Sequence, residues 1–286
     1  MIHELITQWM GKAPVKQMCR VFGVSRSGLY TARRRSQQVR VCAQGVQATA
    51  AFEASGRSYG SRRLSAALRA GGIDVGRHRA RTLMKRLHLK PQWRRKFVHT
   101  TDSRHGLPVA ANVLQRQFSP HAPNTAWVSD ITYIRTDSGW LYLAAVMDLY
   151  SRKIVGWAMA PSMPAQLVCQ ALSMAIGSRR PAPGLIVHSD RGSQYASAEH
   201  TRLLHAHGLV ASMSRKGNCW DNAVMERFFL NLKMERVWQR RYANQAEARQ
   251  DVADYIVGFY NTVRLHSTLG YSSPSRFEAQ AATEQP

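Results

Sequence analysis

The sequence is short of negative charge, of cysteines and of long hydrophobic runs, and each shortage excludes a class of protein. Only 17 of its 286 residues are Asp or Glu, against 40 Lys and Arg, so the formal net charge is +23. Such a surface attracts polyanions. The four cysteines, at positions 19, 42, 169 and 219, form no CxxC pair and have no histidine at zinc-binding spacing. We therefore expect reduced thiols and no zinc site.

No apolar run approaches the ~18 residues that a membrane-spanning helix requires. Asp148 interrupts the best candidate, LYLAAVMDLY, and the first ten residues lack the charged and apolar regions of an export signal. We expect no membrane contact and a cytoplasmic, nucleoid-associated protein. The length and a hydrophobic content of 44% suffice for one large domain with one or two small ones.

The positive charge is concentrated in the first part of the chain. Residues 1–118 contain 23 Lys and Arg but 4 Asp and Glu, whereas residues 119–286 contain 17 and 13. Within the basic part, VKQMCRVFGVSRSGLYTARRRS shows apolar residues at helical spacing, then a glycine, then a serine that can cap a second helix. The residues concerned are Val15, Met18, Phe22, Gly23, Ser25, Leu29 and Tyr30. This pattern predicts a helix-turn-helix DNA-binding module over residues 1–50.

A second helical pair is predicted over residues 51–90. Leu64 and Leu68 define one apolar face, GGIDV breaks the chain, and Leu83 and Leu87 resume the helical period. The second helix of this pair carries the basic residues that we interpret as DNA-binding, namely Arg77, Arg79, Arg81 and Lys85. The alternative is a pair of small helical hairpins with solvated basic faces. A proline-punctuated basic linker is expected at 91–121.

After the linker the hydrophobic pattern becomes that of strands. AWVSDITYIRT, WLYLAAVMDLYSR and KIVGWAMA predict an antiparallel three-stranded meander, because short polar turns separate them. A helix over 164–177, the strand GLIVHSD, another helix, the strand LVASMS and a helix in NAVMERFFLNL follow. The series predicts an α/β fold with a mixed sheet and helices on its faces, over residues 122–235. Residues 236–286 are expected to form a helical tail.

Three carboxylates in this core are candidates for chemistry. Asp130 lies mid-strand between apolar neighbours, Asp190 ends a strand, and Glu226 lies in the first turns of a well-anchored helix. Taken singly, each has an ordinary explanation as a strand-edge charge, a turn residue or a solvated helix residue. Taken together they fit two hard cations ~3.5–4 Å apart, which need oxygen ligands from several chain elements for phosphodiester cleavage.

The order and spacing of these acids, with 35 residues between Asp190 and Glu226, resemble the DDE arrangement of retroviral integrases and bacterial transposases. The flanking segments WVSDITYI, VHSDRGSQY, GNCWDNAVMERFF and FYNTVRLHSTLGYSSPSRFE resemble the second-frame (OrfB) protein of the insertion-sequence-three transposase family. The resemblance covers about residues 15–280.

The resemblance implies a ribonuclease-H-like core and DNA cleavage with strand transfer at the ends of a mobile element. It implies two Mg²⁺ ions, for which Mn²⁺ can substitute, held by Asp130, Asp190 and Glu226. Lys233, two helical turns beyond Glu226, matches the basic residue that follows the glutamate in the family, and we expect it to hold the DNA end near the metals. The implied partners are the element's terminal inverted repeats, target DNA, further copies of the chain, and an upstream-frame helix-turn-helix protein as fusion or partner.

Two other functions use parts of the same pattern. A plain nuclease would use the same acids without joining strands, and a DNA-binding regulator would rely on the helical pairs alone. Asp148 resembles a ligand, but we expect it to cap or pair at its hairpin with Ser151 or Arg152. We assign His188 and His266 to structure, because neither has a nucleophile or carboxylate at a telling spacing.

Overall fold

A computed structural model describes residues 2–37, 42–91, 107–215 and 219–283. About half of the predicted linker, residues 92–106, lies outside this range, as do residues 216–218 of the loop before Glu226. The chain forms two compact units, Met1–Gln47 and Ala48–Pro286. Neither unit, over its described residues, contains a helix long and apolar enough to cross a bilayer.

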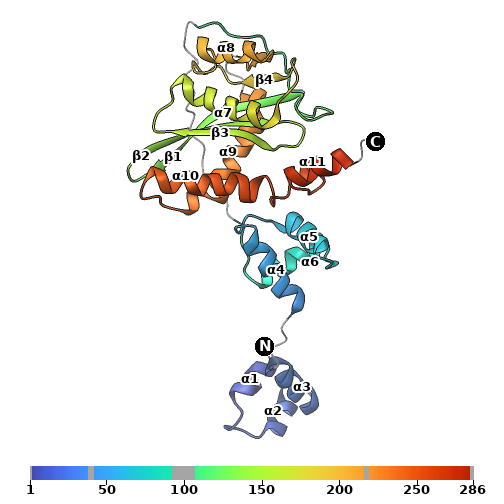
Figure 1. Cartoon of the computed structure of the whole chain (residues 1–286). Helices are drawn as coiled ribbons and strands as arrows, with labels where there is room; N and C mark the ends of the chain where they lie inside the picture. The colour runs from blue at the N-terminus through green and yellow to red at the C-terminus, as the bar shows by residue number, and fades with distance from the viewer. Residues whose placement is uncertain (1, 38–41, 92–106, 216–218, 284–286) are drawn as a thin grey trace. The chain divides into compact units, whose positions relative to one another are not determined.

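The first unit contains three helices, α1 (Ile2–Gln8), α2 (Val15–Val21) and α3 (Arg26–Gln37), as Figure 1 shows. Ile6, Met18, Cys19 and Leu29 form its small core. The predicted turn is confirmed, since Gly23 has a φ of +63° and the Ser25 hydroxyl accepts a hydrogen bond of 3.0 Å from Gly28 N.

The residues of this pattern differ in burial. Met18 and Leu29 belong to the core together with Cys19, whereas Phe22 and Tyr30 are exposed. Phe22 is the C-cap residue of α2, which ends at Val21.

The second unit begins within α4 (Ala43–Ala54) and continues into α5 (Ser61–Ala70) and α6 (Arg77–Arg86). Leu64, Leu68 and Leu83 are buried as predicted, whereas Leu87 follows the end of α6 and is exposed. Met84 takes the inward position instead. The helical pair that the leucine pattern predicts is therefore present, with its last contact shifted by three residues.

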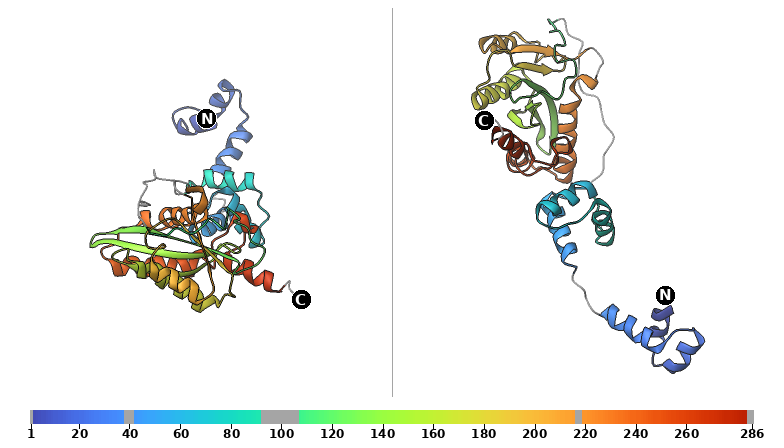
Figure 2. Two further views of the ribbon diagram at one scale, coloured as in Figure 1. Left: turned by 90° about the horizontal axis from the view of Figure 1, so that it is seen from above. Right: turned by 90° about the vertical axis from the view of Figure 1, so that its right-hand side faces the viewer.

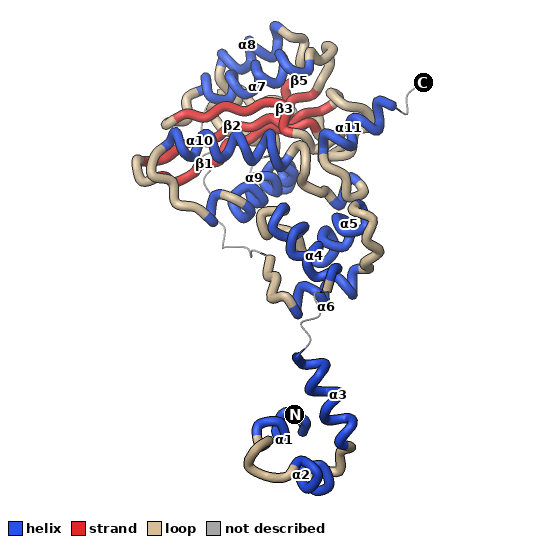
Figure 3. Tube along the Cα trace, turned by 60° about the horizontal axis from the view of Figure 1, so that its bottom comes forward, coloured by secondary structure: helices blue, strands red, loops and turns tan. Residues whose placement is uncertain are grey.

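The centre of the second unit is a five-stranded mixed sheet, drawn in red in Figure 3. Its strand order is β3-β2-β1-β4-β5. Its strands are β1 (Ala126–Thr136), β2 (Gly139–Asp148), β3 (Ile154–Ala160), β4 (Ile186–Ser189) and β5 (Val210–Met213). β1, β2 and β3 pair antiparallel, and β4 and β5 are parallel to β1. The predicted meander and mixed sheet are thus confirmed.

Helices cover both faces of the sheet (Figures 1 and 2). On one face α7 (Ala165–Arg179) and α8 (Ala198–Ala206) pack against Trp127, Ala144 and Val146. The alternate residues of the strands, such as Val128 and Ala145, face the other side. α7 lies so close to β3 that a Cβ at Gly156 would stand 2.2 Å from the Ala171 carbonyl oxygen, so only glycine fits there.

The opposite face is covered by α9 (Ala223–Glu235) and by the C-terminal segment. After the short turn η2 (Val237–Gln239), this segment contains α10 (Gln245–Asp254) and η3 (Tyr255–Tyr260), a stretch of π-helix. It ends with η4 (Ser267–Leu269) and α11 (Pro274–Thr283). Val252, Tyr255 and Ile256 belong to the same buried cluster as β1 and α9. The C-terminal segment therefore completes one core with the sheet.

Candidate active site

Backbone pairing brings Asp130 and Asp190 to one edge of the sheet. β1 and β4 run parallel, with Val128 opposite His188. Asp130 lies two residues beyond Val128, and Asp190 lies two residues beyond His188, directly after the last residue of β4. Side chains two residues apart share a face, and neighbouring strands lie ~4.8 Å apart, so the register places the two carboxylates side by side.

The loop after Asp190 holds its carboxylate by a tight local turn. Asp190 Oδ1 accepts a hydrogen bond of 2.9 Å from Gly192 N. A Cβ at Gly192 would lie 3.0 Å from that same oxygen and 3.0 Å from Gln194 Oε1. A side chain at Gly192 would therefore push against the carboxylate that the turn positions.

Glu226 and Lys233 come to the same region on α9. This helix packs on β1 through Met225, Phe228 and Leu232, which are fully or almost fully buried. Lys233 lies with its ammonium 4.4 Å from the centre of the Tyr133 ring, and Tyr133 belongs to β1, three residues after Asp130. Lys233 thus lies against the strand of the first acid, held by a cation–π contact.

The pKa of Asp130 depends on the charges of Asp190, Glu226 and Lys233. Burial raises the pKa of Asp130 well above its ordinary value, and the charges of Asp190 and Glu226 raise it further. A hydrogen bond from Ile131 N and the charge of Lys233 oppose this rise. Burial lowers the pKa of Lys233, while Asp130 raises it. Asp130 therefore faces the charges of two further carboxylates and of one lysine.

The chemistry of these three side chains, carboxylate oxygens from three chain elements, suits hard divalent cations. Three oxygen donors on three chain elements provide the ligand type and the negative charge that Mg²⁺ or Mn²⁺ requires. Among the described residues, no group of three or more His, Cys, Asp or Glu side chains is already arranged to hold a metal ion. Like charges repel without a cation between them, so binding would require the three carboxylates to approach one another.

A buried tyrosine and a buried histidine form hydrogen bonds with serines next to this edge of the sheet. The Tyr195 hydroxyl lies 3.1 Å from the Ser129 hydroxyl, and burial together with Asp130 and Asp190 raises the Tyr195 pKa, so the phenol stays neutral. His188 Nδ1 lies 2.8 Å from Ser212 Oγ and its Nε2 lies 3.2 Å from Ser214 Oγ.

The tautomer of His188 follows from its neighbours. Ser212 Oγ already accepts hydrogen bonds from Val113 N and Leu114 N, so its proton goes to Nδ1, and Nε2 donates to Ser214. Burial lowers the pKa of His188 to about 4. A neutral, fully hydrogen-bonded imidazole agrees with the structural role that the sequence predicts.

Asp148 also has a structural environment: it caps its hairpin as predicted, but the arginine that donates a hydrogen bond to it is Arg179 and not Arg152. It is fully buried and accepts hydrogen bonds from Asn124 N, Tyr150 N and the Arg179 guanidinium. Ser151 instead donates to Glu278. Arg179 comes from α7, and a contact across 31 residues leaves no spacing signal in the sequence.

Asp221 is a residue of this region that sequence reasoning did not single out as functional. Its side chain is fully buried and accepts hydrogen bonds from Arg116 Nε at 2.7 Å, from Asn112 Nδ2 at 3.0 Å and from Arg215 N at 3.0 Å. The Arg215 guanidinium also donates to it and holds its pKa well below the usual range. No motif spacing links residues 112, 116, 215 and 221, so only the fold reveals this cluster.

The predicted DNA-binding residues Arg77, Arg79, Arg81 and Lys85 lie on α6, and all four side chains are exposed. The buried residues of this helix are Ala80, Leu83 and Met84. α6 therefore has one face in the core of the helical pair, while its basic residues are accessible to solvent.

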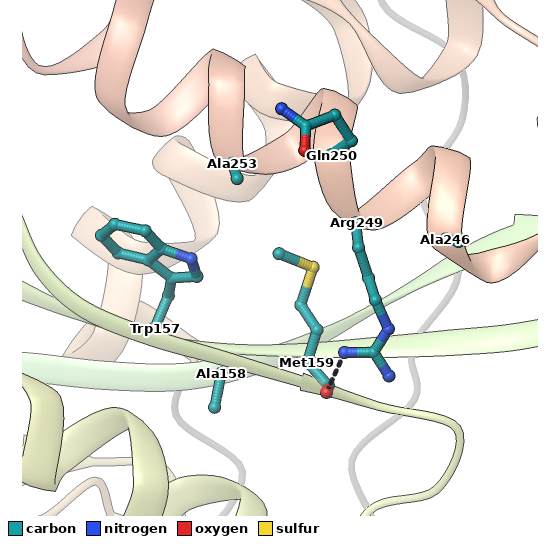
Figure 4. Close-up of a pocket in the computed structure, with 7 residues that line it drawn as sticks. All are labelled: Trp157, Ala158, Met159, Ala246, Arg249, Gln250 and Ala253. Atoms are coloured by element: carbon teal, nitrogen blue, oxygen red, sulfur yellow. Dashed lines mark hydrogen bonds between the residues drawn. The ribbon is translucent and has the colours of Figure 1, made fainter.

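A cavity of about 470 Å³ lies elsewhere, between β3 and α10 (Figure 4). Trp157, Met159 and Gln250 line it, and the Arg249 guanidinium donates a hydrogen bond to the Met159 carbonyl oxygen. β3 is an edge strand, so this arginine covers one of its carbonyl groups. The cavity contains none of the candidate acids.

Comparison with known proteins identifies the domains of the chain. The integrase core domain family matches residues 120–219 and, in a second profile, residues 207–274. The HTH-like domain family matches residues 43–97. The core of the chain is thus an integrase core, as the resemblance implied, and an HTH-like domain precedes it.

Solved structures that are similar to this chain include a catalytic core domain of HTLV-2 integrase in complex with magnesium. It is 15% identical, with a TM-score of 0.42 over 55% of this chain and 98% of that chain. A simian T-cell lymphotropic virus intasome is 15% identical, with a TM-score of 0.48 over 75% of this chain and 70% of that chain.

Two curated relatives match over nearly the full length. The uncharacterized 31 kDa protein of insertion element IS600 from Shigella sonnei is 46% identical over 91% of this chain and 97% of the relative. Transposase InsF for insertion sequence IS3A from Escherichia coli (strain K12) is 43% identical over 97% of this chain and 98% of the relative. With an integrase core and an HTH-like domain in the order that the sequence predicts, the chain belongs to the IS3 family of insertion-sequence transposases.

Proposed function

We propose that Asp130, Asp190 and Glu226 are the catalytic residues and the metal ligands of a DNA-cleaving and DNA-joining reaction. One observation carries this proposal. Asp130 of β1 interacts electrostatically with two other carboxylates, Asp190 at the end of β4 and Glu226 of α9. The three residues would hold two Mg²⁺ ions, or Mn²⁺ in their place, which would supply positive charge to activate a hydroxyl nucleophile and to stabilise the departing oxygen.

The reaction is two in-line displacements at phosphorus. In the first, water attacks the phosphodiester at the element end, one P–O bond forms and one breaks, and a free 3′-OH leaves. In the second, that 3′-OH attacks a phosphodiester of target DNA and a second 3′-OH leaves. The number of P–O bonds is unchanged in strand transfer, so the joining step needs no external energy source and no covalent protein intermediate.

Other residues of the chain bind and orient the DNA. Lys233 contacts a phosphate of the element end, a role supported by its cation–π contact with Tyr133 and by its interaction with Asp130. The exposed basic residues of α6, Arg77, Arg79, Arg81 and Lys85, contact the DNA backbone. Transfer of an element needs both of its ends in one complex, so we propose a homo-oligomer on the terminal inverted repeats, with an upstream-frame helix-turn-helix protein as fusion or partner.

A strand-transfer assay tests the chemistry. The full chain is incubated with Mg²⁺, a labelled element-end duplex and a supercoiled plasmid, and cleaved and joined products are separated on a gel. We expect both products from the wild type and neither from Asp130→Asn or Glu226→Gln. Cleaved ends without joined plasmid would identify a plain nuclease instead. Element mobility that is unchanged in both variants would identify a DNA-binding regulator.

The metal sites are tested separately from catalysis. We expect Mn²⁺ titration, followed by calorimetry, to show two sites in the wild type and weakened binding in Glu226→Gln. Lys233→Ala should weaken retention of the end duplex more than it weakens Mn²⁺ binding, because Lys233 is no metal ligand. Equal losses in both measurements would contradict the role assigned to Lys233.

A further inference from the structure

Trp220 is an exposed aromatic residue next to a buried aspartate. Its exposed fraction is 69%, the highest of the large hydrophobic side chains in the described part of the second unit, whereas the next residue, Asp221, is fully buried. Both belong to η1 (Cys219–Asn222), the short 3₁₀ turn that precedes α9. Exposure of an indole to water is unfavourable, and tryptophan is enriched at binding interfaces.

The backbone beneath Trp220 is fixed at two points. On one side, the Asp221 carboxylate accepts hydrogen bonds from Arg215 N and from the Arg215 guanidinium, at 3.0 Å each. On the other side, Asn222 Nδ2 donates a hydrogen bond of 3.3 Å to the Ser129 carbonyl oxygen. η1 is therefore fastened both to the chain that leaves β5 and to β1.

These two fastening points flank the candidate acids. Ser129 directly precedes Asp130 in β1. β5 pairs parallel with β4, with Met213 opposite Ser189, so the residues that follow each strand, Asp190 and Ser214, lie at the same sheet edge, with Arg215 next to Ser214. η1 spans from the β5 side to the β1 side of this edge, and β4 with Asp190 lies between the two. Trp220 is thus an exposed aromatic group beside the carboxylates.

Two arginines bind the residue that follows Trp220. Asp221 is shared by Arg116 and Arg215, so two guanidinium groups surround one carboxylate. The two arginine side chains are 42% and 57% exposed, so a ligand can reach both of them. An aromatic platform with guanidinium groups beside it suits a nucleic-acid strand, because a base can stack on the ring while its phosphates meet the cations.

We propose that Trp220, with Arg215 and Arg116, forms a binding subsite for an unpaired nucleotide of the DNA end beside the scissile phosphate. The indole stacks on the base, and the two guanidinium groups contact the flanking phosphates. Stacking on an aromatic ring tolerates any base, so the subsite selects a single-stranded or frayed end over paired DNA and does not read sequence. This proposal rests on the proposed function, because it specifies the form in which that active site takes its substrate.

A binding experiment without metal tests this subsite. The full chain is titrated, in EDTA, with a 20-base-pair duplex and with the same duplex carrying a four-nucleotide single-stranded tail, labelled with 2-aminopurine at the first unpaired position. We expect the tailed duplex to bind about tenfold more tightly, with quenched 2-aminopurine fluorescence. Trp220→Leu should abolish the preference and the quenching, whereas Trp220→Phe should retain most of both.

A second pair of variants tests the phosphate contacts. Arg215→Ala should reduce the slope of log affinity against log salt by about one for the tailed duplex. The matched control is Arg241→Ala, which removes another exposed arginine that pairs with an aspartate, Asp137 at 3.0 Å, and should leave the slope unchanged.

Three results would overturn the subsite. They are equal affinity of the wild type for both duplexes, an undiminished tail preference in Trp220→Leu, and the same salt slope in Arg215→Ala as in the wild type. Neither metal nor cleavage enters this assay. A chain that prefers the tail but never joins strands would refute the proposed chemistry and keep the subsite.

Discussion

The second unit contains two kinds of inward-facing carboxylate, and they differ in their partners. Asp148, Asp221, Glu235 and Glu278 each accept a hydrogen bond from an arginine. Asp130 instead lies under the influence of two other carboxylates and of Lys233. A guanidinium satisfies a buried carboxylate within the fold, whereas facing carboxylates destabilise it until a cation separates them. The comparison separates acids that hold the fold from acids that we propose act on DNA.

The largest effect that this comparison predicts is on catalysis. Asp130→Asn and Glu226→Gln should reduce strand transfer by at least ~10³-fold, because each removes one carboxylate of the proposed metal site. Glu235→Gln, at the far end of the same helix α9, should retain activity at temperatures at which it stays folded. Single-turnover rates with Mn²⁺ measure the difference. Comparable losses from Glu226→Gln and Glu235→Gln would break the division between the two kinds of acid.

Stability should show the opposite order. Glu235 accepts hydrogen bonds at 2.8 Å from Arg264 Nε and Nη2, and Arg264 has only 3% of its side chain exposed. Glu235→Gln leaves that buried guanidinium without its counter-charge and should reduce the free energy of unfolding by about 3 kcal/mol. Urea unfolding measures this loss. Glu226→Gln is the matched control, and without divalent ions it should leave stability unchanged or higher, since it removes a like charge.

Two buried histidines predict a dependence of stability on pH. Burial and the Arg264 charge lower the pKa of His266 to about 2, and burial lowers that of His200 to about 4. Both histidines stay neutral in the folded chain but take up protons in the unfolded chain below about pH 6.5. Their contribution to stability is therefore present above that pH and is lost as the pH falls toward 4, by up to ~1.4 kcal/mol per pH unit for each histidine.

His266→Asn isolates the contribution of His266. Unfolding by urea between pH 7 and pH 4.5 should show a shallower loss of stability in this variant than in the wild type, because one of the histidines that take up a proton only on unfolding is gone. An equal slope in both proteins would mean that His266 is protonated in the folded chain. That result would contradict the neutral state that we assign to His266 beside Arg264.

The smallest effect concerns the link between the HTH-like domain and α9. Arg63 of α5 lies 3.5 Å from Glu235, and its side chain is 29% exposed, so this ion pair is weaker than that of Arg264. Arg63→Met should lower the free energy of unfolding by less than about 1 kcal/mol. Thermal unfolding measures the change. Arg57→Met, which removes the solvated pair with Glu53, is the control and should have a still smaller effect. A loss as large as that of Glu235→Gln would show that Arg63 is the main partner of Glu235.

Much of the fold could be predicted from local patterns. The period-two runs gave β1 to β3 in the correct order, because alternation along a strand directly reflects which side chains face the core. The helix carrying Glu226 and the turn at Gly23 were predicted for similar reasons. The family resemblance, now confirmed, supplied the order of the three acids, which spacing alone would have left ambiguous.

What sequence reasoning missed depends on contacts between distant residues. The Asp221 cluster joins residues 112, 116 and 215 to the start of α9, and the Glu235 cluster joins α5, α9 and the segment before η4. Neither has a periodicity or a motif. Asp148 was given local partners for the same reason, whereas its arginine comes from α7. The spacing of apolar residues puts Phe22 in line with Val15 and Met18, but the helix ends at Val21 and Phe22 is exposed.

The parallel register of β1 and β4 also sets where this chain can tolerate insertions and deletions. Asp130 and Asp190 are aligned by backbone pairing of residues 126–128 with 186–188, not by any bond between their side chains. A residue added within 126–130 or 186–190 would turn one carboxylate to the opposite face. A residue added in the turn at Asp137–Ser138, or in the segment 180–184 before β4, leaves that alignment intact. Deep insertion scanning should therefore find two short intolerant windows separated by permissive turns.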